Sequence, residues 1–154
     1  MNVLHISSGK VLTVQIESIT EEDYKQIKRS VYYFDWKREK EHNVFKLSLL
    51  DDSHIIGLIS LKNIDSEERI EIRLLAVSKE NRGRSKIFEG ITGNLIAFAC
   101  RDAINRYGSN GCVSLYPKTA LRQHYIDKYG FIDSGYHLYI EAMPMFQMIK
   151  KFEL

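Results

Sequence analysis

The sequence predicts an α+β protein in which a single mixed, mostly antiparallel sheet is flanked by helices. Three observations lead to this fold class. The 154 residues, 44% of them apolar, suit one domain (1–154) with one core. Short alternating segments between polar turns indicate antiparallel strands in the first half. The second half alternates helical and strand patterns, which is the order of a β-α-β unit in a mixed sheet.

The first strand and helix are predicted near the N-terminus. Residues 11–17 alternate β-branched and polar side chains, which is typical of a strand. Thr20 can cap a helix, and the acids at 21–23 suit the positive end of its dipole. We therefore expect a helix that ends near Ser30.

Three antiparallel strands are expected next. Residues 44–50 and 55–61 flank the polar turn 51–53, which predicts a hairpin. A second polar turn at 65–68 leads into an apolar strand at 69–78.

The longest helical pattern spans 91–107, where apolar residues recur every three to four positions. A short strand at 112–116 follows and stops at Pro117. A helix at 119–129 then precedes Gly130, a residue suited to a left-handed cap.

The C-terminal region predicts a hairpin of strands at 131–134 and 136–141, and then a helix at about 145–153. One face of this amphipathic helix carries Met145, Met148, Ile149 and Phe152. We expect that face to dock on the domain or on a second subunit, so a homodimer is one prediction.

Composition excludes several function classes. The net charge of +2 excludes a strongly basic nucleic-acid arm, so no nucleic-acid partner is expected. No apolar run reaches the roughly 18 residues of a membrane helix, and no signal peptide is recognisable, so we expect a cytoplasmic protein without a membrane partner. Cys100 and Cys112 lack metal-ligand spacing and the histidines are scattered, so we predict free thiols and no metal site.

The most specific motif lies at the end of the 69–78 strand. Leu75–Val77 closes the strand, Arg82 comes five positions later, and Gly83 follows it directly. This pattern and the order of elements over 11–142 resemble the GNAT superfamily of acetyl-CoA-dependent N-acyltransferases. The resemblance implies acetyl-CoA as the acyl donor and a phosphate-binding loop after the strand.

The pyrophosphate-loop motif is degenerate in this chain. Ser85 and Ile87 stand at two positions where the family favours glycine, which lets a backbone approach a phosphate closely. The resemblance implies that the cofactor is bound by Leu75, Ala76, Val77, Arg82, Gly83, Arg84, Ser85, Lys86 and Ile87. Two alternatives stay open: a longer loop that uses Gly90–Gly93, and a solvated charged turn without a ligand.

Glu71 is the candidate catalytic base. Several GNAT histone acetyltransferases use a glutamate six positions before the last strand residue, and Glu71 stands six before Val77. On a regular strand the two residues share one face. The alternative is a surface ion pair with Arg69 or Arg73.

Tyr125 is the candidate acid. The family often has a tyrosine four residues before a Gly-Phe pair, near the departing thiolate, but Ile126 occupies that position here. Tyr125 lies one residue earlier, which is a rotation of about 100° on a helix. The alternatives are that Tyr125 packs on Leu121, and that His124 titrates in its place.

The run Val31–Trp36 is rich in aromatic residues and contains Asp35. We expect most of it to anchor the core; alternatively, the aromatic rings and Asp35 hold a cationic substrate.

The predicted function is transfer of an acetyl group from acetyl-CoA to an amine of a small molecule or peptide, by direct attack. The first alternative is a catalytically inactive GNAT-like module that binds acyl-CoA or another protein. The second is an acyltransferase acting on charged tRNA, with phosphate contacts from Lys37, Arg38, Lys40 and the basic cluster at 82–86.

Overall fold

A computed structural model describes residues 1–153, with the backbone alone at Thr119 and Glu153. These residues form one mixed sheet with the strand order β6-β1-β2-β3-β4-β5-β7-β9-β8. The strands are β1 (Asn2–His5), β2 (Val11–Ser18), β3 (Asn43–Leu49), β4 (Ile55–Ile64), β5 (Arg69–Val77), β6 (Phe88–Glu89), β7 (Cys112–Leu115), β8 (Ile132–Asp133) and β9 (Leu138–Glu141). Every pairing within this range is antiparallel except β5 with β7. The predicted fold class is confirmed.

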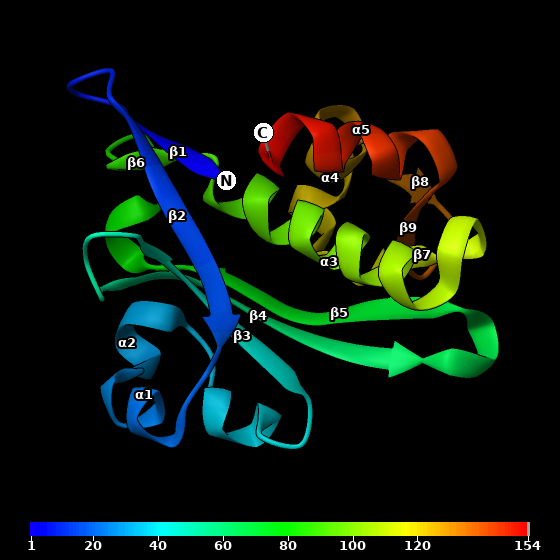
Figure 1. Cartoon of the computed structure of the whole chain (residues 1–154), viewed down its shortest axis with the longest axis horizontal. Helices are drawn as coiled ribbons and strands as arrows, with labels where there is room; N and C mark the ends of the chain where they lie inside the picture. Colours follow the sequence, from blue (N-terminus) through cyan, green and yellow to red (C-terminus); the bar gives the residue numbers. More distant parts are fainter. Residues whose placement is uncertain (154) are drawn as a thin grey trace.

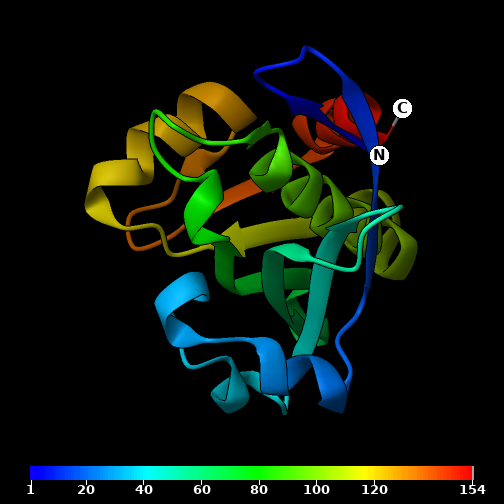
Figure 2. The ribbon, with the colours of Figure 1, turned by 90° about the vertical axis from the view of Figure 1, so that its left-hand side faces the viewer.

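Helices cover both faces of the sheet (Figure 1). They are α1 (Glu21–Gln26), α2 (Arg29–Tyr32), α3 (Ile91–Tyr107), α4 (Arg122–Tyr129) and α5 (Ala142–Glu153). The helices α3, α4 and α5 lie on one face, and α1 and α2 lie on the other (Figures 1 and 2). The larger apolar core lies under α3, and a smaller one lies under α1 and α2.

The predicted helix ending near Ser30 is wrong in its second half. The predicted N-terminus is correct, because Thr20 and Asp23 form a reciprocal capping box. The chain then turns extended at Ile27 and Lys28, so α1 and α2 are separate short helices. The second one ends at Tyr33, whose φ of 71° is left-handed.

Two strands were missed. The N-terminal β1 pairs with β6, a two-residue strand just before α3. Both are too short to show a clear alternation of apolar and polar residues in the sequence. Their pairing places the start of α3 beside the N-terminus.

The C-terminal helix docks on its own domain. It begins at Ala142 rather than near residue 145, and Met145 and Met148 are buried in the larger core. The ring of Phe152 covers Gly93 on α3 so closely that a Cβ added at Gly93 would collide with it. The homodimer stays a prediction.

A bulge in β5 changes which side chains face which core. Ser60 pairs with Leu74 while the next residue, Leu61, pairs with Ile72, so Arg73 is an extra residue in β5. Ile72 therefore faces the larger core before the bulge, and Leu74 faces the smaller one after it.

The bulge overturns one sequence prediction. Leu75 and Val77 pack against the core under α3, together with Ile70 and Ile72 from before the bulge. Glu71 consequently lies on the opposite face from Val77, not on the same face as a regular strand would require.

Candidate active site

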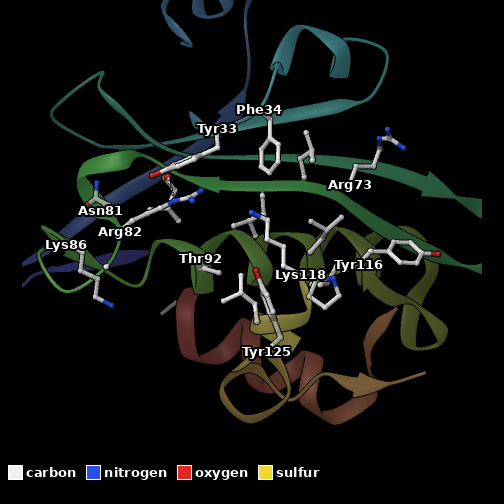
Figure 3. Close-up of a pocket in the computed structure, with 18 residues that line it drawn as sticks. Tyr33, Phe34, Arg73, Asn81, Arg82, Lys86, Thr92, Tyr116, Lys118 and Tyr125 are labelled. Atoms are coloured by element: carbon white, nitrogen blue, oxygen red, sulfur yellow. Dashed lines mark hydrogen bonds between the residues drawn. The ribbon is translucent and has the colours of Figure 1, made fainter. Parts of the chain in front are cut away.

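The site lies where β5 and β7 separate. These parallel strands pair only from Arg69 with Cys112 to Ile72 with Leu115. Beyond Ile72, no described strand borders this edge of β5. A cavity of about 580 Å³ fills the gap, lined by β5, the loop after it, the ends of α2 and β7, and the starts of α3 and α4 (Figure 3).

The end of β5 forms one wall of the cavity. Leu75 and Val77 line it, as do Ile72 and Leu74. Ala76 points the other way and is buried in the smaller core. Of the three strand residues predicted to bind cofactor, the side chain of Ala76 therefore cannot reach a ligand in the cavity.

Arg82 connects the loop after β5 with the α2 side of the molecule. Its Nε donates to the carbonyl of Val77 at 3.2 Å, and its guanidinium carbon lies 3.2 Å from the centre of the Tyr33 ring. Burial lowers the pKa of Arg82, and Tyr33 and Tyr125 oppose that effect. At any physiological pH the guanidinium still carries its charge at this end of the cavity.

Asn81 holds the two ends of the loop together. Its Nδ2 donates to the hydroxyl of Ser78 at 3.0 Å, and its Oδ1 accepts from the backbone N–H of Phe88 at 2.9 Å. Asn81 is buried and lines the cavity, but a polar residue in a turn gives no sequence signal for such a clasp. Sequence reasoning missed it.

The loop that begins at Arg82 is longer than the family motif. Gly83 turns the chain with a φ of 72°, but α3 does not begin until Ile91, after Gly90 with a φ of 100°. Ser85 and Ile87 therefore do not lie at a helix N-terminus, and their role in cofactor binding stays a prediction.

Only part of the loop faces the cavity. Gly83 and Lys86 line it, whereas Arg84, Ser85 and Ile87 do not. Thr92, in the first turn of α3, lines it as well. The helix start agrees with the alternative in which a longer loop uses Gly90–Gly93.

Tyr125 points into the cavity from α4 (Figure 3). Its ring packs against Tyr129 at 5.8 Å and Phe131 at 6.0 Å between centroids. Burial raises the pKa of the Tyr125 hydroxyl above its ordinary value of 10.0, although the charge of Arg82 lowers it. The hydroxyl is therefore protonated near neutral pH. By contrast, His124 is exposed and does not line the cavity.

Glu71 lies outside the cavity. Its carboxylate oxygens are 3.6 Å from Nη1 of Arg69 and 4.0 Å from Nη1 of Arg73. Arg73, in turn, lines the cavity. The ion pairs of Glu71 with Arg69 and Arg73, which were the alternative to a catalytic base, are therefore present. Arg73 lies between Glu71 and the cavity.

The aromatic run divides between core and cavity. Tyr32 and Trp36 are buried, with hydrogen bonds from the Tyr32 hydroxyl to the carbonyl of Ile55 at 2.6 Å and from Trp36 Nε1 to the carbonyl of Tyr32 at 3.1 Å. Tyr33 and Phe34 line the cavity instead. The expectation of a core anchor is thus correct for two of the rings.

The cavity has a cationic lining. Arg82 and Lys86 lie at its loop end, and Arg73 and Lys118 are also among its lining residues (Figure 3). No aspartate or glutamate appears among the described residues that line it. An anion therefore gains favourable charge interactions there.

The described residues contain no group of three or more histidine, cysteine or acidic side chains placed to hold a metal ion. Across the same part of the chain, no helix is both long and apolar enough to cross a membrane. The predictions of no metal and of a cytoplasmic location stay predictions.

The family model described as the acetyltransferase (GNAT) family matches residues 13–131, which is more than half of the chain. The chain belongs to the GNAT acetyltransferase family. This confirms both the resemblance seen in the motif after β5 and the prediction of an acyltransferase. No curated protein matches the sequence.

Solved GNAT structures share the fold at low sequence identity. Mutant forms of the spermidine/spermine N-acetyltransferase SpeG from Vibrio cholerae superpose with a TM-score of 0.63 and 15% identity, over 88% of this chain and 98% of that one. The ribosomal-protein-S18-alanine N-acetyltransferase from Escherichia coli gives 0.58 and 13%, over 83% and 90%. A Bacillus subtilis acetyltransferase in complex with CoA gives 0.56 and 14%, over 86% and 99%. At these identities the likeness establishes the fold alone.

Proposed function

We propose that this chain transfers an acetyl group from acetyl-CoA to the amine of a small molecule or peptide. The observation that carries the proposal is the cationic cavity at the gap between β5 and β7, with the Tyr125 hydroxyl pointing into it. Membership of the GNAT family supports acetyl-CoA as the donor, and a CoA complex in a structural neighbour supports it further.

The residues of the cavity fit coenzyme A. Arg82 and Lys86 would meet its phosphates, together with Thr92 and the free N–H groups in the first turn of α3. The unpaired edge of β5 beyond Ile72 offers backbone N–H and C=O groups to the amides of the pantetheine arm. Val77, at the end of this edge, lies between the edge proposed for the pantetheine arm and the loop proposed for the phosphates.

When bound, acetyl-CoA supplies a thioester: a C–N bond to the acceptor forms, the C–S bond breaks, the nitrogen loses a proton and the sulfur gains one. Tyr125 holds a proton on its hydroxyl, which its raised pKa keeps in place near neutral pH. It is the proposed donor of the proton that the sulfur needs. A backbone N–H on the open edge of β5 is proposed to stabilise the thioester oxygen.

Glu71 is the proposed base, and the structure restricts how it could act. Its carboxylate does not line the cavity, but it contacts Arg73, which does. Removal of the amine proton must therefore pass through water between the acceptor and Glu71. The competing proposal is that Glu71 only orients Arg73.

The inactive-module alternative loses its main support. It rested on the two missing glycines at Ser85 and Ile87 and on the shifted tyrosine. The helix begins four residues after Ile87, so neither loop residue lies at its N-terminus, and Tyr125 lines the cavity despite the shift. One observation favours the tRNA alternative: AtaT, a structural neighbour, was solved in complex with acetyl-methionyl-tRNAfMet. The absence of a nucleic-acid partner stays a prediction for this chain.

Transfer itself tests the proposal. We expect mass spectrometry to find an isotopically labelled acetyl group on at least one amine after incubation of a mixed amine pool with labelled acetyl-CoA. We expect much less product with the Tyr125→Phe variant. Hydrolysis of acetyl-CoA at equal rates by both proteins, with no acetylated amine, would contradict the proposed function.

A further inference from the structure

We infer that the acceptor is an amine that also carries an anionic group, a carboxylate or a phosphate, rather than a polyamine or a lysine side chain. The inference rests on the proposed acetyl transfer and names the acceptor class of that reaction. It follows from the charges of the residues that line a side pocket of the cavity, and from the contacts that the two acids of this pocket make with arginines.

The side pocket adjoins the main cavity on the α1 and α2 side of the sheet. Its volume is about 290 Å³, and it shares Phe34, Arg73 and Leu74 with the main cavity. That volume is at the small end of ligand pockets and suits a group the size of an amino acid. An acceptor whose amine is in the main cavity could place its other end here.

The lining of the side pocket is more basic than acidic. Three arginines, Arg29, Arg38 and Arg73, line it together with two acids, Asp35 and Glu39. Arg29 makes no ion pair with any residue in the described range 1–153. An anion that enters the pocket would therefore meet guanidinium N–H donors. The planar guanidinium can donate two parallel hydrogen bonds to either a carboxylate or a phosphate.

Both acids of the side pocket are already paired. Glu39 is 5% exposed, and its Oε2 accepts a hydrogen bond from Nε of Arg73 at 3.1 Å. Asp35 Oδ2 is 3.5 Å from Nε of Arg38. The buried Glu39 carboxylate cannot turn to a substrate ammonium group without losing its hydrogen bond to Arg73, whereas Asp35 is half-exposed and its contact with Arg38 is a weak surface pair.

Arg73 keeps donors for a ligand. Its Nε is used by Glu39 and its Nη1 approaches Glu71 at 4.0 Å, which leaves other N–H groups of the five on a guanidinium. A buried ion pair adds little stability in general, but it orients its members. Glu39 therefore acts as a positioning residue, which holds Arg73 at the wall common to both pockets.

The tyrosine ring of the aromatic run that lines the main cavity is already covered by a cation. The Tyr33 ring already stacks on the guanidinium of Arg82 at 3.2 Å. Lys118, another cation, lines the main cavity. The alternative in which the aromatic run and Asp35 hold a cationic substrate is therefore disfavoured, because Arg82 covers the Tyr33 ring and the arginines and Lys118 around the two pockets repel a cation.

Matched acceptor pairs test the inference. With acetyl-CoA as donor, release of the free CoA thiol would be followed for amino acids and dipeptides against their C-terminal amides, and for phosphoethanolamine against ethanolamine. Spermidine and a lysine peptide complete the panel. We expect kcat/KM for the anionic member of at least one matched pair to exceed that of its neutral partner by about tenfold or more, the range of a charged hydrogen bond. The two kinds of pair separate a carboxylate from a phosphate acceptor.

Variants add a second readout. Arg73→Gln should reduce the preference for the anionic member of the pair, measured as the ratio of the two kcat/KM values in one preparation, by about tenfold. Lys37→Gln, an exposed change outside both pockets, is the matched control. Efficient use of spermidine, or of the amides as readily as the acids, would overturn the inference and leave the acetyl transfer standing. No transfer to any acceptor, with no binding of CoA, would overturn the proposed function itself.

Discussion

The two faces of β5 are built in different ways. Toward α3, the strand contributes to one continuous apolar core, and the long helix has the regular periodicity that its sequence shows. Toward α1 and α2, the core is smaller, the helices are short, and the buried Glu39 pairs with Arg73 at a bulge. In the proposed reaction, the regular face supports the end of the cavity assigned to the cofactor, and the irregular face supplies the charged groups of the end assigned to the acceptor.

The difference teaches where specificity can vary in this fold. A helix start and an open strand edge bind phosphates and amides through the backbone, so they depend little on side-chain identity. The acceptor end depends on a few side chains whose positions are set by one extra residue in β5. Changes to the α3 face should therefore affect every acceptor equally, and changes to the other face should alter the choice among acceptors.

Removal of α5 should have the largest effect. Truncation after Glu141 exposes the α3 surface that Met145, Met148 and Phe152 cover. At about 1.5–3 kcal/mol for each buried side chain, the loss approaches the whole stability of a small domain. We expect the truncated chain to lack a cooperative thermal transition by circular dichroism. A melting temperature equal to that of the full chain would show that α5 contributes nothing to the stability of the domain.

Tyr125→Phe should leave folding intact and slow catalysis. The variant keeps the ring contacts with Tyr129 and Phe131 but removes the proposed proton donor. We expect kcat to fall by roughly 10²–10⁴ for every acceptor. Because burial raises the pKa of Tyr125 despite the charge of Arg82, the parent should lose activity from ionisation of Tyr125 only above pH 10.0. An unchanged kcat would remove Tyr125 from the mechanism.

Glu71→Gln tests whether the irregular face also supplies the base. A base that acts through water should contribute about 10²-fold to kcat, the lower end of the range for a positioned base. We expect that loss, with little change in CoA affinity. If Glu71 only orients Arg73, KM for the anionic acceptor should change instead and kcat should not.

Asp23→Ala should have the smallest effect, on the stability of the α1 side alone. Burial raises the pKa of Asp23, but hydrogen bonds from Lys46 and Thr20 outweigh it, so the folded pKa lies below the ordinary 3.8. The contribution of Asp23 is therefore present above its unfolded pKa and is lost as the pH falls through the folded value. We expect a loss of about 1–2 kcal/mol at pH 7 in urea unfolding, and a smaller loss near pH 3. An equal loss of stability at both pH values would contradict the link between the lowered pKa of Asp23 and the stability of the fold.

The sequence predicted the regular face better than the irregular one. The bounds of α3 were correct, because a 17-residue amphipathic stripe depends on local periodicity. The Thr20 cap was correct because its partners are three residues away. The break at Ile27 was missed because the Thr20 cap and the acids at 21–23 mark only where a helix begins, so they suit a longer helix equally well.

The candidate site was predicted in part. The motif located β5 and Arg82, and Tyr125 does line the cavity although it is one residue away from the family position. The bulge at Arg73 could not be predicted, because it depends on how β4 and β5 pair across the sheet. For the same reason the sequence could not place Glu39 behind Arg73 or Asn81 beneath the cofactor loop.

Calorimetric titration of CoA tests the central claim most directly, because the chain offers matched cations in one loop. Arg82 and Lys86 line the cavity and Arg84 does not. We predict that CoA binds the parent and Arg84→Ala with equal affinity. We predict that Arg82→Ala with Lys86→Ala weakens binding by about 2–4 kcal/mol, or about 30-fold or more. Equal affinity of the double variant and the parent, or no binding of CoA by the parent, would contradict the account.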